Sequence, residues 1–246
     1  MQRCTRVLWG VVALGAAAWA QKIAPAPLSA EQIFEKNIAA SGGREALGKW
    51  PAMQFRGEFE VPGMGSKIVV DSYGKAPDKR LTVVRIEGFG AVRTGFDGQT
   101  AWAEDPQQGL RILQGEALDR VRRDSIYNPE LRWREVFREV QLLPKGKVGD
   151  RETYVIRFSL KWGQPITRYY DAENFMVLRQ DADVDSGQGV VTAQNYMSDY
   201  RDVEGVKFPF AIRQTTPAGE ITIKITEVKF AATMEDAPFA PPAKKP

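Results

Sequence analysis

The sequence predicts a mainly β protein with some helix: a strongly curved antiparallel sheet, or incomplete β-barrel, of about 11 strands capped by helices. From Met53 onward, apolar and polar residues alternate with a period of two, which indicates half-buried strands. Turn residues such as Asp97-Gly98 and Glu204-Gly205 separate these segments at hairpin spacing. Few helical segments interrupt the strands, whereas a parallel α/β sheet needs a helix between most strand pairs.

Two short helices are expected before the first strand. Ser29 and Gln32 have the spacing of a capping box, in which each side chain bonds the other residue's backbone amide. The helix that they begin should end at Gly42-Gly43, and a second helical piece should cover residues 44–50.

Residues 115–137 interrupt the strands and are expected to be helical, in two pieces separated at Asn128-Pro129. Helices inserted into a β chain must bury an apolar face against the sheet. This insertion therefore either plugs one end of the barrel as core or closes over its concave face as a movable lid.

The N-terminus has the features of a secretory signal peptide. Arg3 and Arg6 precede a short apolar run that closes with Ala18-Trp19-Ala20. The run is shorter than the roughly 20 residues of a membrane span, so we expect cleavage after Ala20 rather than a retained anchor. Cys4 precedes the run, whereas lipid attachment would need a cysteine directly after it.

These observations divide the chain into four parts. We expect a signal peptide over residues 1–20, a flexible lead over 21–27, a single domain over 28–242 and a tail over 243–246.

Composition excludes several classes of function. The chain has no histidine and one cysteine, so it cannot build a Ser-His-Asp or Cys-His nucleophile system, a histidine-liganded metal site or an internal disulfide. The formal net charge is +3, with both signs well mixed, which is not the footprint of a nucleic-acid-binding protein. We expect no enzymatic activity, no cofactor and no metal.

Two motifs suggest chemistry but have simpler interpretations. Residues 63–67 (GMGSK) resemble part of a phosphate-binding loop, yet they lack its residue order and lead into a strand instead of a helix. Asp181, Asp183 and Asp185 could bind calcium or act as paired acids, but the glycine and distal glutamate of a calcium loop are missing. Solvated turn carboxylates are the preferred interpretation.

A group of arginines lies on the inserted helices. It is either a solvated helix face or a patch that meets anionic lipid headgroups or an acidic partner. Its members are Arg120, Arg122, Arg123, Arg132 and Arg134.

Three short motifs carry a family resemblance. They are residues 73–80 (YGKAPDKR) followed by 94–102 (TGFDGQTAW), the late hairpin 199–209 (DYRDVEGVKFP), and the closing segment Phe239-Ala240-Pro241. With the order of helices and strands, these motifs resemble the outer-membrane lipoprotein carrier and lipoprotein-sorting family (LolA/LolB-like) over residues 28–242.

The resemblance implies a half-open barrel whose apolar cavity shelters acyl chains from water, in a periplasmic protein. Its expected partners are an acylated lipoprotein or lipid, inner-membrane proteins that release this cargo and outer-membrane proteins that accept it, with peripheral membrane contact. The resemblance also implies an arginine after the K-x-P proline that ties down the lid, and Arg80 is the candidate. It implies no catalytic residue.

Apolar side chains on the strands and the insertion are either plain core or the lining of such a cavity. The cavity candidates are Phe55, Phe59, Trp102, Leu118, Val121, Trp133 and Phe137. The leading hypothesis is thus a carrier or binding protein for lipoproteins or lipids. An envelope sensor that binds lipid as a signal is the alternative, and an acid-base enzyme using Asp or Glu is a third class.

Overall fold

The computed structural model describes residues 27–63, 65–185 and 189–243. The predicted signal peptide with its cleavage site, most of the expected lead and most of the expected tail lie outside these residues. The helical elements are α1 (Ala30–Ala40), α2 (Gly43–Lys49), α3 (Gly115–Ser125), η1 (Pro129–Arg132), α4 (Trp133–Val136) and η2 (Ala237–Phe239).

The strands fall into two runs. The first run is β1 (Ala52–Glu60), β2 (Ile68–Lys75), β3 (Lys79–Ile86), β4 (Gly90–Phe96), β5 (Ala101–Asp105) and β6 (Gly109–Ile112). The second run is β7 (Phe137–Val148), β8 (Arg151–Leu160), β9 (Ile166–Asp171), β10 (Val177–Asp185), β11 (Val190–Val203), β12 (Val206–Thr216) and β13 (Gly219–Ala231).

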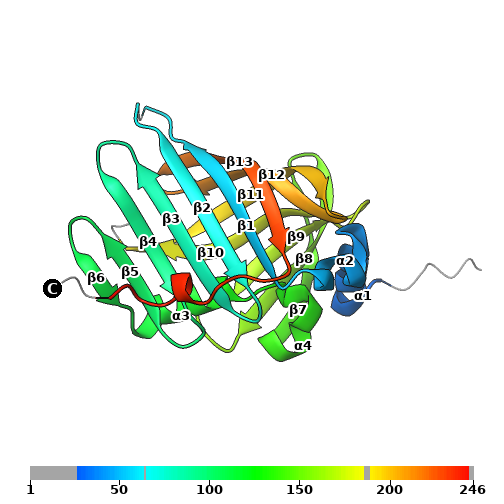
Figure 1. Ribbon diagram of the computed structural model, residues 1–246. Helices are drawn as coiled ribbons and strands as arrows, with labels where there is room; N and C mark the ends of the chain where they lie inside the picture. Colours follow the sequence, from blue (N-terminus) through cyan, green and yellow to red (C-terminus); the bar gives the residue numbers. More distant parts are fainter. Residues whose placement is uncertain (1–26, 64, 186–188, 244–246) are drawn as a thin grey trace, which may run out of the picture.

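All thirteen strands form one antiparallel sheet in the order β6-β5-β4-β3-β2-β1-β13-β12-β11-β10-β9-β8-β7. Each run is a series of hairpins, and the pairing of β1 with β13 joins the two runs. The sheet curves strongly but does not close, since β6 and β7 remain at its edges (Figure 1). The predicted open, curved antiparallel sheet is confirmed. The thirteen strands of the described residues exceed the expected number of about 11.

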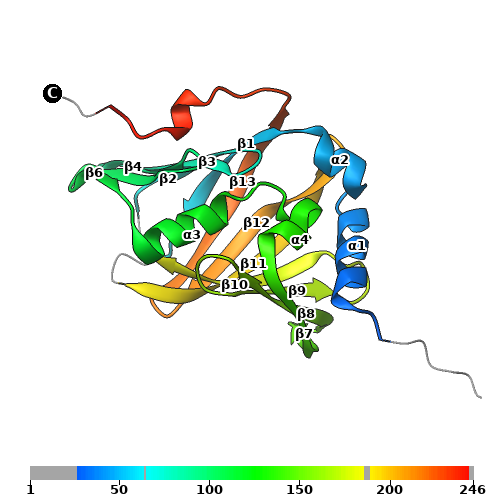
Figure 2. The ribbon, with the colours of Figure 1, turned by 90° about the horizontal axis from the view of Figure 1, so that it is seen from below.

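The helices occupy the end and the inside of this curve. Figure 2 shows α3 and α4 between the layer of β2–β4 and the layer of β9–β11, with α1 and α2 at one end. The insertion is indeed helical in pieces, and Asn128 with a left-handed φ of 44° separates α3 from η1. The Asn128 side chain donates to the Leu47 carbonyl at 2.7 Å, which ties the insertion to α2.

Helix α1 begins where the capping box predicts. The Gln32 backbone amide donates to Ser29 Oγ at 3.2 Å, and the Ser29 amide donates to Gln32 Oε1 at 2.9 Å. Its buried face, with Ile33 and Phe34 fully buried, packs against the insertion and the strands of the second run.

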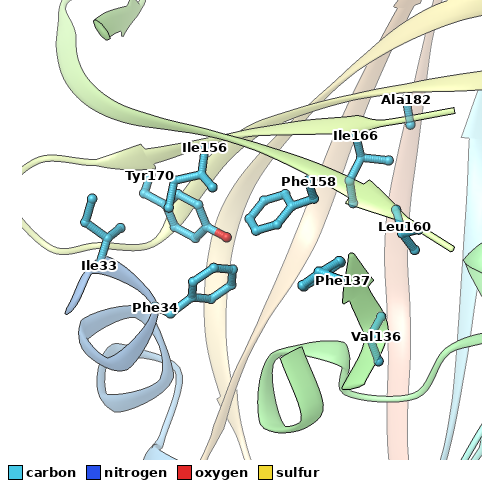
Figure 3. Packing of buried hydrophobic residues seen from close by; sticks show 10 residues of the cluster. All are labelled: Ile33, Phe34, Val136, Phe137, Ile156, Phe158, Leu160, Ile166, Tyr170 and Ala182. Atoms are coloured by element: carbon cyan, nitrogen blue, oxygen red, sulfur yellow. The ribbon is translucent and has the colours of Figure 1, made fainter. Parts of the chain in front are cut away.

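An aromatic core fills one end of the barrel (Figure 3). Phe34 of α1 stacks on Trp133 of α4 at a ring distance of 5.7 Å and meets Phe158 of β8 edge-on at 5.1 Å. Phe137 packs on Phe158 at 4.6 Å. Because these rings come from α1, α4 and β8, the second half of the insertion is a plug in the core. The first half, α3, has a different setting.

The late hairpin packs on the junction between α1 and α2. The Lys207 amide donates to the Ser41 carbonyl at 3.0 Å. Gly42 has a φ of +120°, and a Cβ added there would lie 2.0 Å from the Gly205 carbonyl oxygen. A glycine is therefore required for both its backbone conformation and its close contact with the β11–β12 turn.

The variant Gly42→Ala should destabilise the fold by more than the roughly 1–3 kcal/mol of backbone strain alone, because steric overlap with Gly205 adds to it. Gly43→Ala is the matched control, since Gly43 also has a positive φ of +86° but no atom within 4 Å of an added Cβ. Urea unfolding of both variants gives the comparison. Equal losses of unfolding free energy would show that the contact with Gly205 is unimportant.

Candidate functional site

A cavity lies between the concave face of the sheet and the insertion, and it has two lobes. The central lobe has a volume of about 570 Å³, and the second lobe, which we call the methionine lobe, about 400 Å³. Both volumes are within the usual range of small-molecule sites. Arg80, Arg168 and Gln180 line both lobes, so the lobes meet at these three side chains.

The methionine lobe has an apolar part beside polar side chains such as Asn37, Glu130 and Lys207. Three methionines line it, and their unbranched, polarizable side chains adapt to flexible hydrocarbon. The main apolar lining residues are Met53, Met176, Val177, Met197, Phe208 and Phe230.

The central lobe has one apolar side and one polar side. Its apolar side comes from the insertion and the aromatic core, through Val121, Ile126, Phe137, Leu160, Ile166 and Ala182. Its polar side includes side chains of four adjacent strands, β9 to β12, which face each other in register: Arg168 opposite Gln180, Gln180 opposite Asn195, and Asn195 opposite Gln214. We call these four residues the polar ladder.

Hydrogen bonds connect the polar ladder. Gln214 Nε2 donates to Asn195 Oδ1 at 2.8 Å, and Asn195 Nδ2 donates to the Gln180 backbone carbonyl at 3.4 Å. Arg168 Nε donates to Gln180 Oε1 at 2.8 Å. Each bond fixes the orientation of a side chain that lines the central lobe.

The two arginines at the meeting point of the lobes differ in their partners. Arg168 is ion-paired with Glu130 of η1. Burial lowers the pKa of the Arg168 guanidinium, but the interactions with Glu130 and Tyr170 together outweigh burial, and the pKa is raised. Arg80 Nη1 donates to the Asp124 backbone carbonyl of α3 at 2.9 Å. Burial lowers the pKa of the Arg80 guanidinium, and the charge of Asp124 offsets only part of this effect.

Helix α3 is held at the open edge of β10 by a buried ion pair. The pairing of β9 with β10 ends at Asp181, so the backbone of β10 beyond it lacks a strand neighbour on that side. Arg123 occupies this edge: it is ion-paired with the Asp183 carboxylate, and its Nη2 donates to the Asp183 carbonyl at 2.9 Å. Burial lowers the pKa of Arg123, but the carboxylates of Asp124 and Asp183 outweigh it, so the pKa is raised.

The arginine group of the insertion is therefore neither a wholly solvated face nor an unpaired basic patch. Arg123 is only 5% exposed, and the other members also have partners within the described residues. Arg120 pairs with Asp185 at 3.5 Å, Arg132 with Glu135 at 2.9 Å, Arg134 with Glu31, and Arg122 stacks over Trp162 at 5.0 Å.

The interpretation of the three aspartates as solvated turn carboxylates is wrong for Asp183, which is buried against Arg123. Asp181 pairs with Arg179 of its own strand at 2.6 Å. In the described parts of the chain, no group of three or more Asp, Glu, Cys or His side chains is placed to hold a metal ion.

The structure brings together only some of the predicted cavity residues. Val121 and Phe137 line the central lobe. Phe55 packs at 6.0 Å against Phe208 of the methionine lobe. Arg80 reaches the insertion by donating to the Asp124 backbone carbonyl.

The other predicted cavity residues lie elsewhere. Trp133 belongs to the aromatic core, stacked on Phe34. Leu118 is half-buried on α3 and lines neither lobe, and Phe59 lies near the end of β1 beside a separate surface hollow.

Trp102 faces away from the cavity. Its Nε1 donates to the Phe239 carbonyl at 2.8 Å, and Leu81, Val83 and Phe239 surround it. Figure 2 shows the C-terminal segment with η2 on the outer side of the first run of strands, opposite α3. Alternation places Trp102 on one face of β5. It does not reveal that Phe239, near the C-terminus, covers that face.

Sequence reasoning missed the polar ladder and the three methionines. In the sequence, the polar ladder is an amide or arginine at corresponding positions of neighbouring strands. This pattern can be recognised only once the strand register is known.

Solved structures share this fold. No family model and no curated protein matches the chain. A DUF1329 family protein from Desulfovibrio piger covers 85% of the chain and 95% of its own length at 12% identity, with a TM-score of 0.56. A LolA superfamily protein from Nitrosomonas europaea covers 87% and 98% at 14% identity, also with a TM-score of 0.56. A domain from Vibrio parahaemolyticus assigned to outer-membrane lipoprotein sorting covers 85% and 95% at 12% identity, with a TM-score of 0.53.

These similarities show that the chain has the LolA-like open barrel with its helical cap. Separately, none of the helices in the described residues is both long and apolar enough to cross a membrane.

The variant Asp183→Asn should destabilise the protein by about 3 kcal/mol, because it leaves the Arg123 charge buried with only partial compensation. Replacing both partners, with Arg123→Met and Asp183→Leu, should recover most of this loss. Glu135→Gln, which breaks the exposed pair with Arg132, is the control and should change stability by less than about 1 kcal/mol. Thermal unfolding measures all three, and a double variant as unstable as Asp183→Asn would contradict this account.

Proposed function

We propose that the protein is an exported, periplasmic binding or carrier protein that shelters acyl chains of lipoproteins or other lipids and moves them toward the outer membrane. The methionine lobe carries this proposal, because three methionines and two phenylalanines line one part of a cavity of about 400 Å³. The fold shared with a LolA superfamily protein and a lipoprotein-sorting domain supports it.

The energetics suit a hydrocarbon ligand. Each buried methylene contributes about 0.8 kcal/mol, so a sixteen-carbon chain could gain on the order of 10 kcal/mol on leaving water. A carrier must also release this ligand, so part of the cavity wall has to move. Helix α3 is the candidate, since polar contacts from Arg80 and Arg123 hold it, while α4 belongs to the aromatic core.

Lipid that co-purifies with the protein and is extracted into organic solvent would support the proposal. The variant Met197→Trp fills part of the methionine lobe. If the larger side chain displaces about three methylenes of ligand, binding weakens by about 2 kcal/mol, or roughly 30-fold. The matched control is Tyr196→Trp, because residue 196 lies on the opposite face of β11 and its ring stacks with Arg213.

Mass spectrometry of the extract from the two variants and the wild type gives the measurement. Equal lipid in all three, or none in the wild type, would count against the proposal.

Transport and sensing are separated by a release experiment. A carrier should move an acylated lipoprotein from spheroplasts into the soluble fraction, in proportion to the amount of protein added. A sensor that binds lipid only as a signal should retain lipid without releasing lipoprotein from the membrane.

A further inference from the structure

The polar ladder is out of place in a cavity that holds only hydrocarbon. Burying polar side chains next to apolar ligand atoms costs free energy, and valine or leucine at these strand positions would stabilise such a complex better. The ladder instead places amide and guanidinium groups along one wall of the central lobe, and two of its members, Arg168 and Gln180, also line the methionine lobe.

The charges around this meeting point are unevenly neutralised. Glu130 faces Arg168 and is its ion-pair partner. Arg80 has a neutral acceptor, the Asp124 backbone carbonyl, and it donates to no carboxylate in the described part of the chain. The Asp124 side chain bonds Arg123 Nε at 2.8 Å and is 56% exposed, so water weakens its effect on Arg80.

Further donors face the same space. Gln180 uses its Oε1 to accept from Arg168, and no described residue accepts from its amide nitrogen. An amide nitrogen and a guanidinium of an arginine are both hydrogen-bond donors, and together they match the oxygens of a carboxylate or phosphate.

We propose that Arg80, with Arg168 and Gln180, binds the anionic headgroup of an amphiphile whose hydrocarbon chain occupies the methionine lobe. The inference rests on the proposed function and narrows its ligand class to lipids with a carboxylate or phosphate group. The lobes meet at these three residues, so one molecule places its charge there and its chain beside Met53, Met176 and Met197.

Titration calorimetry of the full, delipidated protein tests this with three probes below their micelle concentrations. Decyl phosphate carries the anionic headgroup, monodecanoylglycerol has a neutral headgroup and a ten-carbon chain, and inorganic phosphate has no chain. We expect decyl phosphate to bind at least about tenfold more tightly than either other probe, as a charge-assisted hydrogen bond would provide.

The variant Arg80→Met should abolish this preference, so that decyl phosphate binds the variant no more tightly than monodecanoylglycerol does. Arg213→Met is the matched control: Arg213 lies on β12 next to Gln214, pairs with Glu220 and lines neither lobe, so its loss should leave all three affinities unchanged. The comparison of probes in the wild-type protein is decisive even if Arg80→Met does not fold.

The outcomes separate this inference from the proposed function. Equal binding of decyl phosphate and monodecanoylglycerol would overturn the headgroup site and leave lipid binding intact. If inorganic phosphate binds as tightly as decyl phosphate, the hydrocarbon chain plays no part and the ligand is not an amphiphile. If neither alkyl probe binds, both proposals are overturned.

Discussion

The buried ion pair between Arg123 of α3 and Asp183 of β10 determines how helix α3 is held against this open sheet. A sheet whose first and last strands do not meet leaves an unpaired edge and an uncovered concave face. Helix α3 bridges the gap between the two runs of strands. Its Arg123 donates to Asp183 of β10 in the second run, and Arg80 of β3 in the first run donates to the α3 backbone. The ion pair gains little net stability over apolar packing, but its loss leaves a buried charge. It therefore fixes a position for α3 without filling the cavity.

This arrangement separates core from cavity inside one curve. The rings around Phe34 and Phe158 fill the end of the barrel beside α1, and α4 is part of that packing. Helix α3 has few apolar side chains and contacts the strands largely through charged groups, so space remains between it and the sheet. Of the α3 residues only Arg123 and Ser125 are buried, whereas α4 belongs to the aromatic core, so α3 is the less deeply packed half of the insertion.

Much of the fold could be predicted because the relevant signals are local. Ser29 and Gln32 lie one helical turn apart, and the strands follow each other as hairpins, so short patterns specify them. The site was less accessible. An apolar strand position such as Trp102 suits either a cavity wall or a surface covered by the C-terminal segment. The hydrogen bond from Trp102 to the Phe239 carbonyl shows that the second setting is the actual one. Asp183 looks like a turn carboxylate until Arg123, sixty residues earlier, is placed against it.

The sequence by itself determined the succession of helices and strands, the break in the insertion and the absence of histidine chemistry, because each depends on neighbouring residues or on composition. Only the tertiary structure decided which face of each strand lines the cavity. That face depends on the register between strands and on the curvature of the sheet, and a shift of one residue exchanges the two faces. The polar ladder exists for the same reason: its members, from Arg168 to Gln214, become neighbours only when four strands align.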